Sequence, residues 1–179
     1  MSAAPPFDFP CTANGGWDHP PTVGIDTTGE PTQGGVLASV LVRDAISEYW
    51  NDDANLDGVA DNGAGSAFTG FGDVTTDADP GDKDIDITFT GALPNGVLGQ
   101  AICVVNSGVI VRASIELIND DASLDAEDYK NLAAHELGHA IGLRHKGRPL
   151  TMMHKFFFDG QDAYLPLSRT SKKWLQRNY

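Results

Sequence analysis

The residues best spaced for chemistry form the run HELGHAIGLRH, which begins at His135. On a helix, His135 and His139 would project from one face, where both imidazoles can hold one zinc ion. Glu136 lies beside them, placed to act as general base on a zinc-bound water. Gly142 can end the helix in a left-handed conformation and turn the chain, so that His145 supplies a third nitrogen. The pattern predicts three protein ligands with a fourth position left for water.

An H-E-x-x-H sequence alone can be a surface helix with two incidental histidines. The extended pattern is much rarer, on the order of 10⁻⁵ by chance in a chain of this composition. Thr151-Met152-Met153-His154 follows closely after it. Together these segments resemble the zinc signature and the Met-turn of metzincin metallopeptidases. The short spacing is similar to that of the matrixin branch, with Met153 as the apolar floor of the zinc site and Met152 as the rival assignment.

This resemblance implies a zinc-dependent endopeptidase that hydrolyses peptide bonds in extended protein or peptide substrates. Glu136 would accept a proton from the attacking water and pass it to the departing amine. Leu132 and Phe157 would line a pocket for a large apolar side chain, although the Phe156–Phe158 run can equally be core. A different class of function also stays open, namely a calcium-dependent binding or adhesion module that retains a zinc site without proteolysis.

Local patterns predict the elements that must position these groups. A helical period over 36–50 predicts the first long helix, and the alternation of Asp84–Thr90 predicts a strand. Ser123 or Asp125 can cap the active-site helix, and Ser168 or Thr170 the last helix. On the active-site helix, we expect Leu132, His135 and His139 to lie on one side that faces a cleft. Further strands are expected at 23–25, 67–71, 97–105 and 109–118, with Asn106-Ser107-Gly108 joining the last two.

The resemblance then implies an α+β fold of the metzincin type. It comprises a twisted, mixed five-stranded sheet, two long helices, an active-site helix ending in a Gly turn, the Met-turn and a C-terminal helix. The strand near 97–105 would be the sheet edge beside the cleft, where a substrate peptide adds by main-chain hydrogen bonds. Residues 1–21 are rich in Pro, Gly and Asn, which predicts an irregular arm. Residues 22–179 are predicted to form one metallopeptidase catalytic domain.

Two acidic segments are candidate calcium loops. The first has the pattern D-x-N-x-D-G-x-x-D and offers oxygen ligands at alternate positions, although no Glu stands at the twelfth position. Its expected ligands are Asp53, Asn55, Asp57, Val59 and Asp61. A solvated turn is the alternative. The second segment, a weaker candidate, is a predicted loop carrying Asp73, Asp77, Asp79 and Asp82. Calcium is therefore expected as a structural ion beside a catalytic zinc.

The 179-residue chain has a net charge of −13, which argues against nucleic acid as a partner. No run approaches the roughly 20 apolar residues of a membrane helix. The first 25 residues lack a basic start and an apolar run, so no signal peptide is expected within them. We expect a secreted, monomeric protein, whose leader would then have been removed. In an extracellular protein the two cysteines, Cys11 and Cys103, are expected to form a disulfide. The alternative is that one or both are free.

Overall fold

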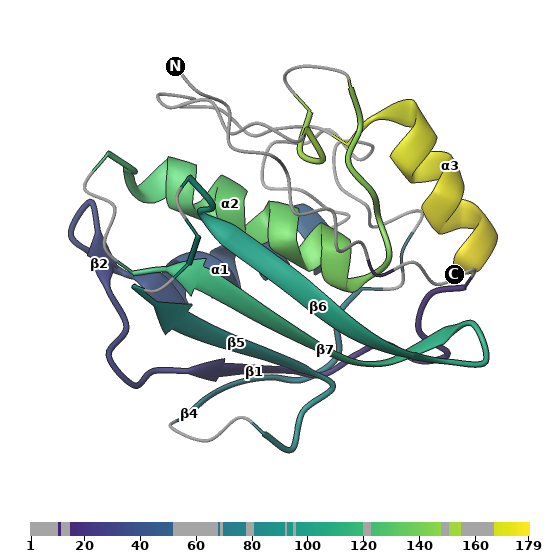
Figure 1. The fold of residues 1–179 in the computed structure, drawn as a ribbon, viewed down its shortest axis with the longest axis horizontal. Helices are drawn as coiled ribbons and strands as arrows, with labels where there is room; N and C mark the ends of the chain where they lie inside the picture. Colours follow the sequence, from purple (N-terminus) through teal and green to yellow (C-terminus); the bar gives the residue numbers. More distant parts are fainter. Residues whose placement is uncertain are drawn as a thin grey trace.

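A five-stranded sheet is the central element of the computed structural model (Figure 1). The structure describes residues 11, 15–51, 68, 70–77, 81–91, 93–94, 96–119, 123–147, 151–154 and 167–179. The strands of the sheet are β1 (Val23–Asp26), β4 (Val74–Asp77), β5 (Ile85–Thr90), β6 (Gly99–Asn106) and β7 (Val109–Ile118). Their spatial order is β4-β1-β5-β7-β6, with β6 antiparallel to β7 and the other neighbours parallel. The predicted mixed five-stranded sheet is confirmed.

Helices cover one face of this sheet. They are α1 (Ala38–Ala45), which continues as the π-helix η1 (Ile46–Asn51), then α2 (Ala126–Ala140) and α3 (Arg169–Asn178). The long helix α2 packs against α1, β6 and β7, and α3 lies beyond the C-terminal end of α2 (Figure 1). Ser168 caps α3 by accepting a hydrogen bond from the Ser171 N–H at 3.2 Å. Within the described ranges, no helix has the length and apolarity that a membrane crossing requires.

The alternating pattern of β5 explains where the core lies. Ile85 and Ile87 are buried on the helix-covered side of the sheet. They pair in register with buried residues of both neighbouring strands, since Ile87 lies between Ile25 on β1 and Ile115 on β7. Side chains of a strand alternate between faces, so this register brings apolar side chains of three strands to one side.

The helix predicted over 36–50 is confirmed from residue 38 onward, but its start was wrong. The chain first forms a two-stranded hairpin of β2 (Thr32–Gln33) and β3 (Val36–Leu37). Gly34 and Gly35 have φ of 56° and 84°, the left-handed values that a tight two-residue hairpin turn requires. This turn takes residues 36 and 37 into a strand, so the helix begins at Ala38. From Ile46 the helix continues as the π-helix η1, which covers the last five predicted residues and extends to Asn51. Leu37 and Val40, although they are apolar members of that helical period, are 47% and 43% exposed.

The strand predicted at 67–71 was also wrong for the residues that the structure describes. Phe68, Gly70 and Phe71 are not in a strand. The Asn51 side chain takes the place of a strand partner, because its Oδ1 accepts from the Phe71 N–H at 2.6 Å and its Nδ2 donates to the Phe71 carbonyl at 3.2 Å. The rings of Phe68 and Phe71, with centroids 5.1 Å apart, both pack against Trp50 in the core.

The second acidic segment is not the loop that was predicted, because β4 runs through it. Val74 pairs with Val23 and Asp77 with Asp26, in parallel with β1. Asp73 and Asp77 therefore lie at opposite ends of an extended strand, about 13 Å apart at the usual rise per residue. Two carboxylates at that separation do not share one cation. Asp79 lies outside the described residues.

The N-terminal segment is fastened to the β6–β7 hairpin. Cys11 forms a disulfide with Cys103 on β6, with a Cα–Cα distance of 5.1 Å, which confirms the predicted pairing. The Gly15 N–H donates to the Gly108 carbonyl at 3.0 Å, and the Ile110 N–H donates to the Gly16 carbonyl at 3.1 Å. Much of the arm predicted over 1–21 lies outside the described residues, namely 1–10 and 12–14.

Candidate metal centre

The helix α2 that carries two of the motif histidines has a defined start. Asp125, one of the two predicted caps, accepts a hydrogen bond from the Asp128 N–H at 2.8 Å. Glu127 and Asp128 add negative charge to the first turn, where the helix dipole favours it. Further along, α2 is more buried than the sequence predicted, since Leu132 and His139, expected on an open face, are only 3% and 7% exposed.

The end of α2 is the Gly turn that the motif predicts. Gly142 has φ of 94°, and its N–H donates to the His139 carbonyl at 2.8 Å. The Leu143 N–H donates to the Gly138 carbonyl at 2.9 Å. These two bonds are the pair that closes a helix in the Schellman motif. The turn redirects the chain within a few residues and brings His145 back to α2.

Three imidazole nitrogens meet at this turn. The Nε2 atom of His139 lies 3.0 Å from that of His135 and 3.1 Å from that of His145, and the third separation is 3.2 Å. Nitrogen ligands of a tetrahedral zinc ion, each bound at about 2.0–2.1 Å, lie about 3.3 Å apart. The observed separations fit that donor set. His135, His139 and His145 therefore form a cluster that could hold a metal ion.

The remaining ring nitrogens of two of these histidines fix their tautomers. The Nδ1 of His135 donates to the Met152 carbonyl at 2.5 Å, and the Nδ1 of His139 donates to the Leu143 carbonyl at 2.8 Å. Because a carbonyl can only accept, Nδ1 carries the hydrogen and Nε2 presents its lone pair to the cluster. Burial, with the nearby His139 as a smaller cause, holds the pKa of His135 well below its ordinary value. This ring is therefore neutral, as a metal ligand must be.

Glu136 is a buried carboxyl beside the cluster, only 5% exposed. Its side chain lies against the backbone of Gly99 on the edge strand β6, where an added Cβ would be 2.8 Å from its Cγ and 2.9 Å from its Oε1. Burial raises the pKa of Glu136 to about 8. Sequence reasoning missed Gly99, although a glycine within a strand often marks the close approach of another group.

The methionine turn packs beneath α2. Met153 is fully buried, and an added Cβ at Gly138 would lie 2.5 Å from its Sδ. The turn is closed by the His154 N–H, which donates to the Thr151 carbonyl at 2.9 Å. Of the two candidate methionines, Met153 contacts the helix through its side chain, whereas Met152 contributes its carbonyl to His135. The glycine in the middle of α2 was the available sequence signal for this close packing.

Several of the predicted site residues cannot be placed relative to the cluster, because they lie outside the described ranges. The expected calcium ligands Asp53, Asn55, Asp57, Val59 and Asp61 lie outside the described residues, as does Phe157 of the expected substrate pocket. Leu132 lies on α2, one turn before His135, and is buried.

The part of the chain that contains the cluster matches a known protein family. The Matrixin family model matches residues 66–179. This range contains the three histidines, Glu136 and the methionine turn. No individual curated protein matches the chain.

Proposed function

The chain belongs to the matrixin family, and on this premise we propose that it is a zinc-dependent endopeptidase acting on extended protein substrates. The observation that carries the proposal is the convergence of three imidazole nitrogens within 3.2 Å of one another, beside the buried carboxyl of Glu136. Family membership supports a metallopeptidase, and the three-histidine cluster fits the zinc that such an enzyme uses.

His135, His139 and His145 would hold the zinc through their Nε2 atoms. Zinc bound by these residues would supply Lewis-acid chemistry, namely polarisation of the scissile carbonyl and activation of a water molecule at neutral pH. The carbonyls of Met152 and Leu143 keep the first two rings in the ligating tautomer, which is the usual role of such partners.

Glu136 would move the protons of the reaction. Its carboxylate accepts a proton from the attacking water and passes it to the departing amine as the peptide bond breaks. Burial raises the pKa of Glu136 to about 8, so its carboxylate can hold the proton taken from the water near neutral pH and then release it to the more basic departing amine. The missing side chain at Gly99 leaves room for the Glu136 carboxyl at the edge of β6.

The same contact supports a location for the substrate. β6 is an edge strand, so its outer main-chain groups are available to pair with an extended peptide. A peptide paired there would pass close to Glu136, because Gly99 belongs to this strand. Leu132 and Phe157 would line the pocket for a large apolar side chain that follows the cleaved bond.

The remaining parts of the proposal concern the protein as a whole. Residues 22–179 would form one catalytic domain preceded by an irregular arm, and the protein would act as a monomer. The D-x-N-x-D-G loop at 53–61 would bind calcium. Secretion is supported by the Cys11–Cys103 disulfide, which persists in oxidising compartments, and by a family whose members are typically extracellular.

The test compares wild-type protein with Glu136→Gln, which keeps the shape of the side chain but cannot accept the proton. Glu127→Gln on the same helix is the matched control. Casein cleavage and zinc content are measured for all three proteins. We expect cleavage by wild type and by the control, at least about 10²-fold less by Glu136→Gln, and equal zinc content throughout. If wild type and Glu136→Gln hold zinc and behave alike, the protease proposal fails, and a binding module becomes the better explanation.

A further inference from the structure

We propose that Trp17 and Tyr179 are positioning residues of the metal centre. These two residues, called here the helix-end pair, hold the last carbonyl groups of α2 and thereby fix the turn that carries His145. The inference rests on the proposed zinc function, because it assigns the pair a role in keeping the zinc ligands in place. It concerns how tightly the centre holds its metal rather than the chemistry of cleavage.

The last four carbonyl groups at the C-terminal end of α2 all have hydrogen-bond partners. The last four carbonyls of a helix have no partner within it and must find one elsewhere. Main-chain N–H groups of the turn serve the Gly138 and His139 carbonyls. The other two belong to Ala140 and Ile141. The indole Nε1 of Trp17 donates to the Ala140 carbonyl at 3.0 Å, and the hydroxyl of Tyr179 donates to the Ile141 carbonyl at 3.0 Å.

The two members of the helix-end pair are coupled to each other. The Trp17 N–H donates to the Tyr179 hydroxyl oxygen at 3.2 Å, while that hydroxyl donates onward to Ile141. Trp17 is 4% exposed. The Tyr179 ring lies edge-on to Phe68 at 4.8 Å and leaves no room for a side chain at Gly16. Hydrogen bonds that are joined in this way and at least partly buried strengthen one another, so the pair acts as one unit.

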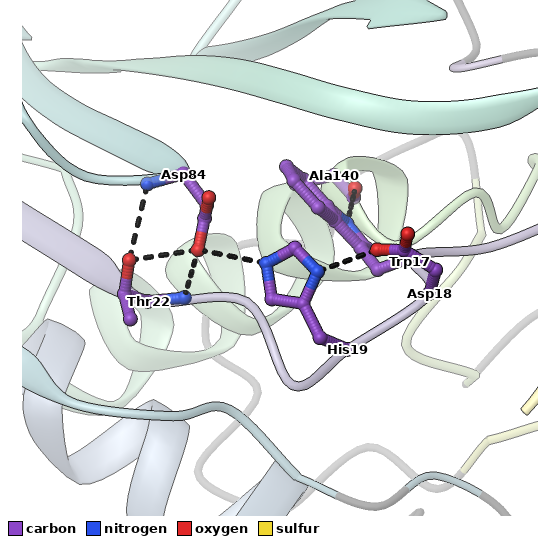
Figure 2. Close-up of polar contacts among 6 residues, drawn as sticks. All are labelled: Trp17, Asp18, His19, Thr22, Asp84 and Ala140. Atoms are coloured by element: carbon purple, nitrogen blue, oxygen red, sulfur yellow. Dashed lines mark hydrogen bonds and ion pairs between the residues drawn. The ribbon is translucent and has the colours of Figure 1, made fainter. Parts of the chain in front are cut away.

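Both members belong to segments that are hydrogen-bonded to regular elements of the fold. Trp17 follows the segment that is hydrogen-bonded to the β6–β7 hairpin, and Figure 2 shows its indole directed at Ala140. In the same segment, His19 is hydrogen-bonded to Asp18 and Asp84 (Figure 2). Tyr179 follows α3, and its N–H donates to the Leu175 carbonyl at 2.9 Å. Residues 162 positions apart thus meet at one helix end.

The turn held by the pair controls two of the three expected ligands. Its Leu143 carbonyl accepts the hydrogen bond from Nδ1 of His139, so a displaced turn would change the orientation of that ring. His145 follows Leu143 by two residues and lies outside α2, so its position depends on the turn. A looser turn would let both nitrogens move relative to His135. The consequence is weaker metal binding, not only a less stable fold.

The experiment compares Tyr179→Phe with Tyr129→Phe as a matched control. Each variant loses one hydroxyl that donates to a main-chain carbonyl, since Tyr129 donates to the Ile118 carbonyl at 2.9 Å near the start of α2. The zinc dissociation constant of the full chain is measured by competition with a chromophoric chelator. We expect Tyr179→Phe to bind zinc about 10-fold more weakly than wild type, and Tyr129→Phe to bind within about twofold of it.

A second variant keeps the test decisive if Tyr179→Phe does not fold. Trp17→Phe removes the indole donor to Ala140 and should weaken zinc binding to a similar degree. In the double variant the two effects should be less than multiplicative, because the pair acts as one unit. Equal zinc affinity in the helix-end variants, the control and wild type would overturn the inference. Casein cleavage by wild type separately decides the peptidase proposal, so the two failures are distinguishable.

Discussion

Replacing both cysteines with serine should destabilise the protein mainly through its unfolded state. The Cys11–Cys103 bond joins residues 92 positions apart in sequence. A cross-link that closes a loop of this length removes conformational entropy from the unfolded chain, and the loop-closure relation gives about 4.6 kcal/mol at 25 °C. Residual structure in the unfolded chain reduces that value, so we expect a loss of about 3–4 kcal/mol in the free energy of unfolding.

The assay is unfolding in guanidinium chloride at a fixed, saturating zinc concentration. The unfolded chain expands further without the cross-link, so the dependence of the free energy on denaturant should also become steeper. Reduced wild type is the matched control, because it has the native sequence and lacks the bond. It should have the same stability as the double serine variant. A loss below about 1 kcal/mol, with an unchanged slope, would refute the unfolded-state explanation.

Two further predictions concern the turn after α2 and the N-terminal segment. Gly142→Ala places a Cβ at φ of 94° and 2.6 Å from the Trp174 ring, so urea unfolding should show a loss of about 2–4 kcal/mol. A loss within about 0.5 kcal/mol would contradict the strained-turn argument. His19→Gln tests how the stability of the fold depends on pH. The hydrogen bond to Asp18 raises the pKa of His19, partial burial opposes this shift, and the hydrogen bond to Asp84 adds to it. A histidine whose pKa is raised in the folded state contributes its full stabilisation below the pKa of the unfolded state, about 6.5. That stabilisation is lost as pH rises through the folded-state pKa. Thermal unfolding should therefore show the variant to be less stable than wild type at about pH 5.5, with a smaller gap at about pH 9. An equal gap at both pH values would count against this account.

The parts of the site that were predictable from sequence depend on local geometry. The histidine spacing requires a helix, and a glycine followed by a third histidine requires a turn with positive φ, which Gly142 adopts. The helix caps Asp125 and Ser168 are likewise local features, because each side chain accepts a hydrogen bond from the N–H three residues later. The alternation of β5 reflects which face of the sheet is buried. In each case a few neighbouring residues contain the whole physical reason.

The elements that sequence analysis placed wrongly depend on competition between local preferences. Residues 36 and 37 fit a helical period, yet the two preceding glycines favour a hairpin turn, and that turn decides their conformation. Phe71 lies in an apolar run that suits a strand. Its main-chain groups are bonded by the side chain of Asn51, 20 residues earlier. No pattern within either segment reports the partner that decides the outcome.

The metal cluster shows why a sequence motif identifies the ligand residues but does not determine the geometry in which they are held. All three histidines lie within eleven residues, but the atoms that hold them are distributed along the chain. The Met152 carbonyl orients His135, and the helix-end pair holds the turn before His145 from positions 17 and 179. A chain could keep every letter of the motif and still lose the geometry through a change at Trp17. The search for active members of such a family should therefore include aromatic donors able to reach the end of the histidine helix, besides the motif itself.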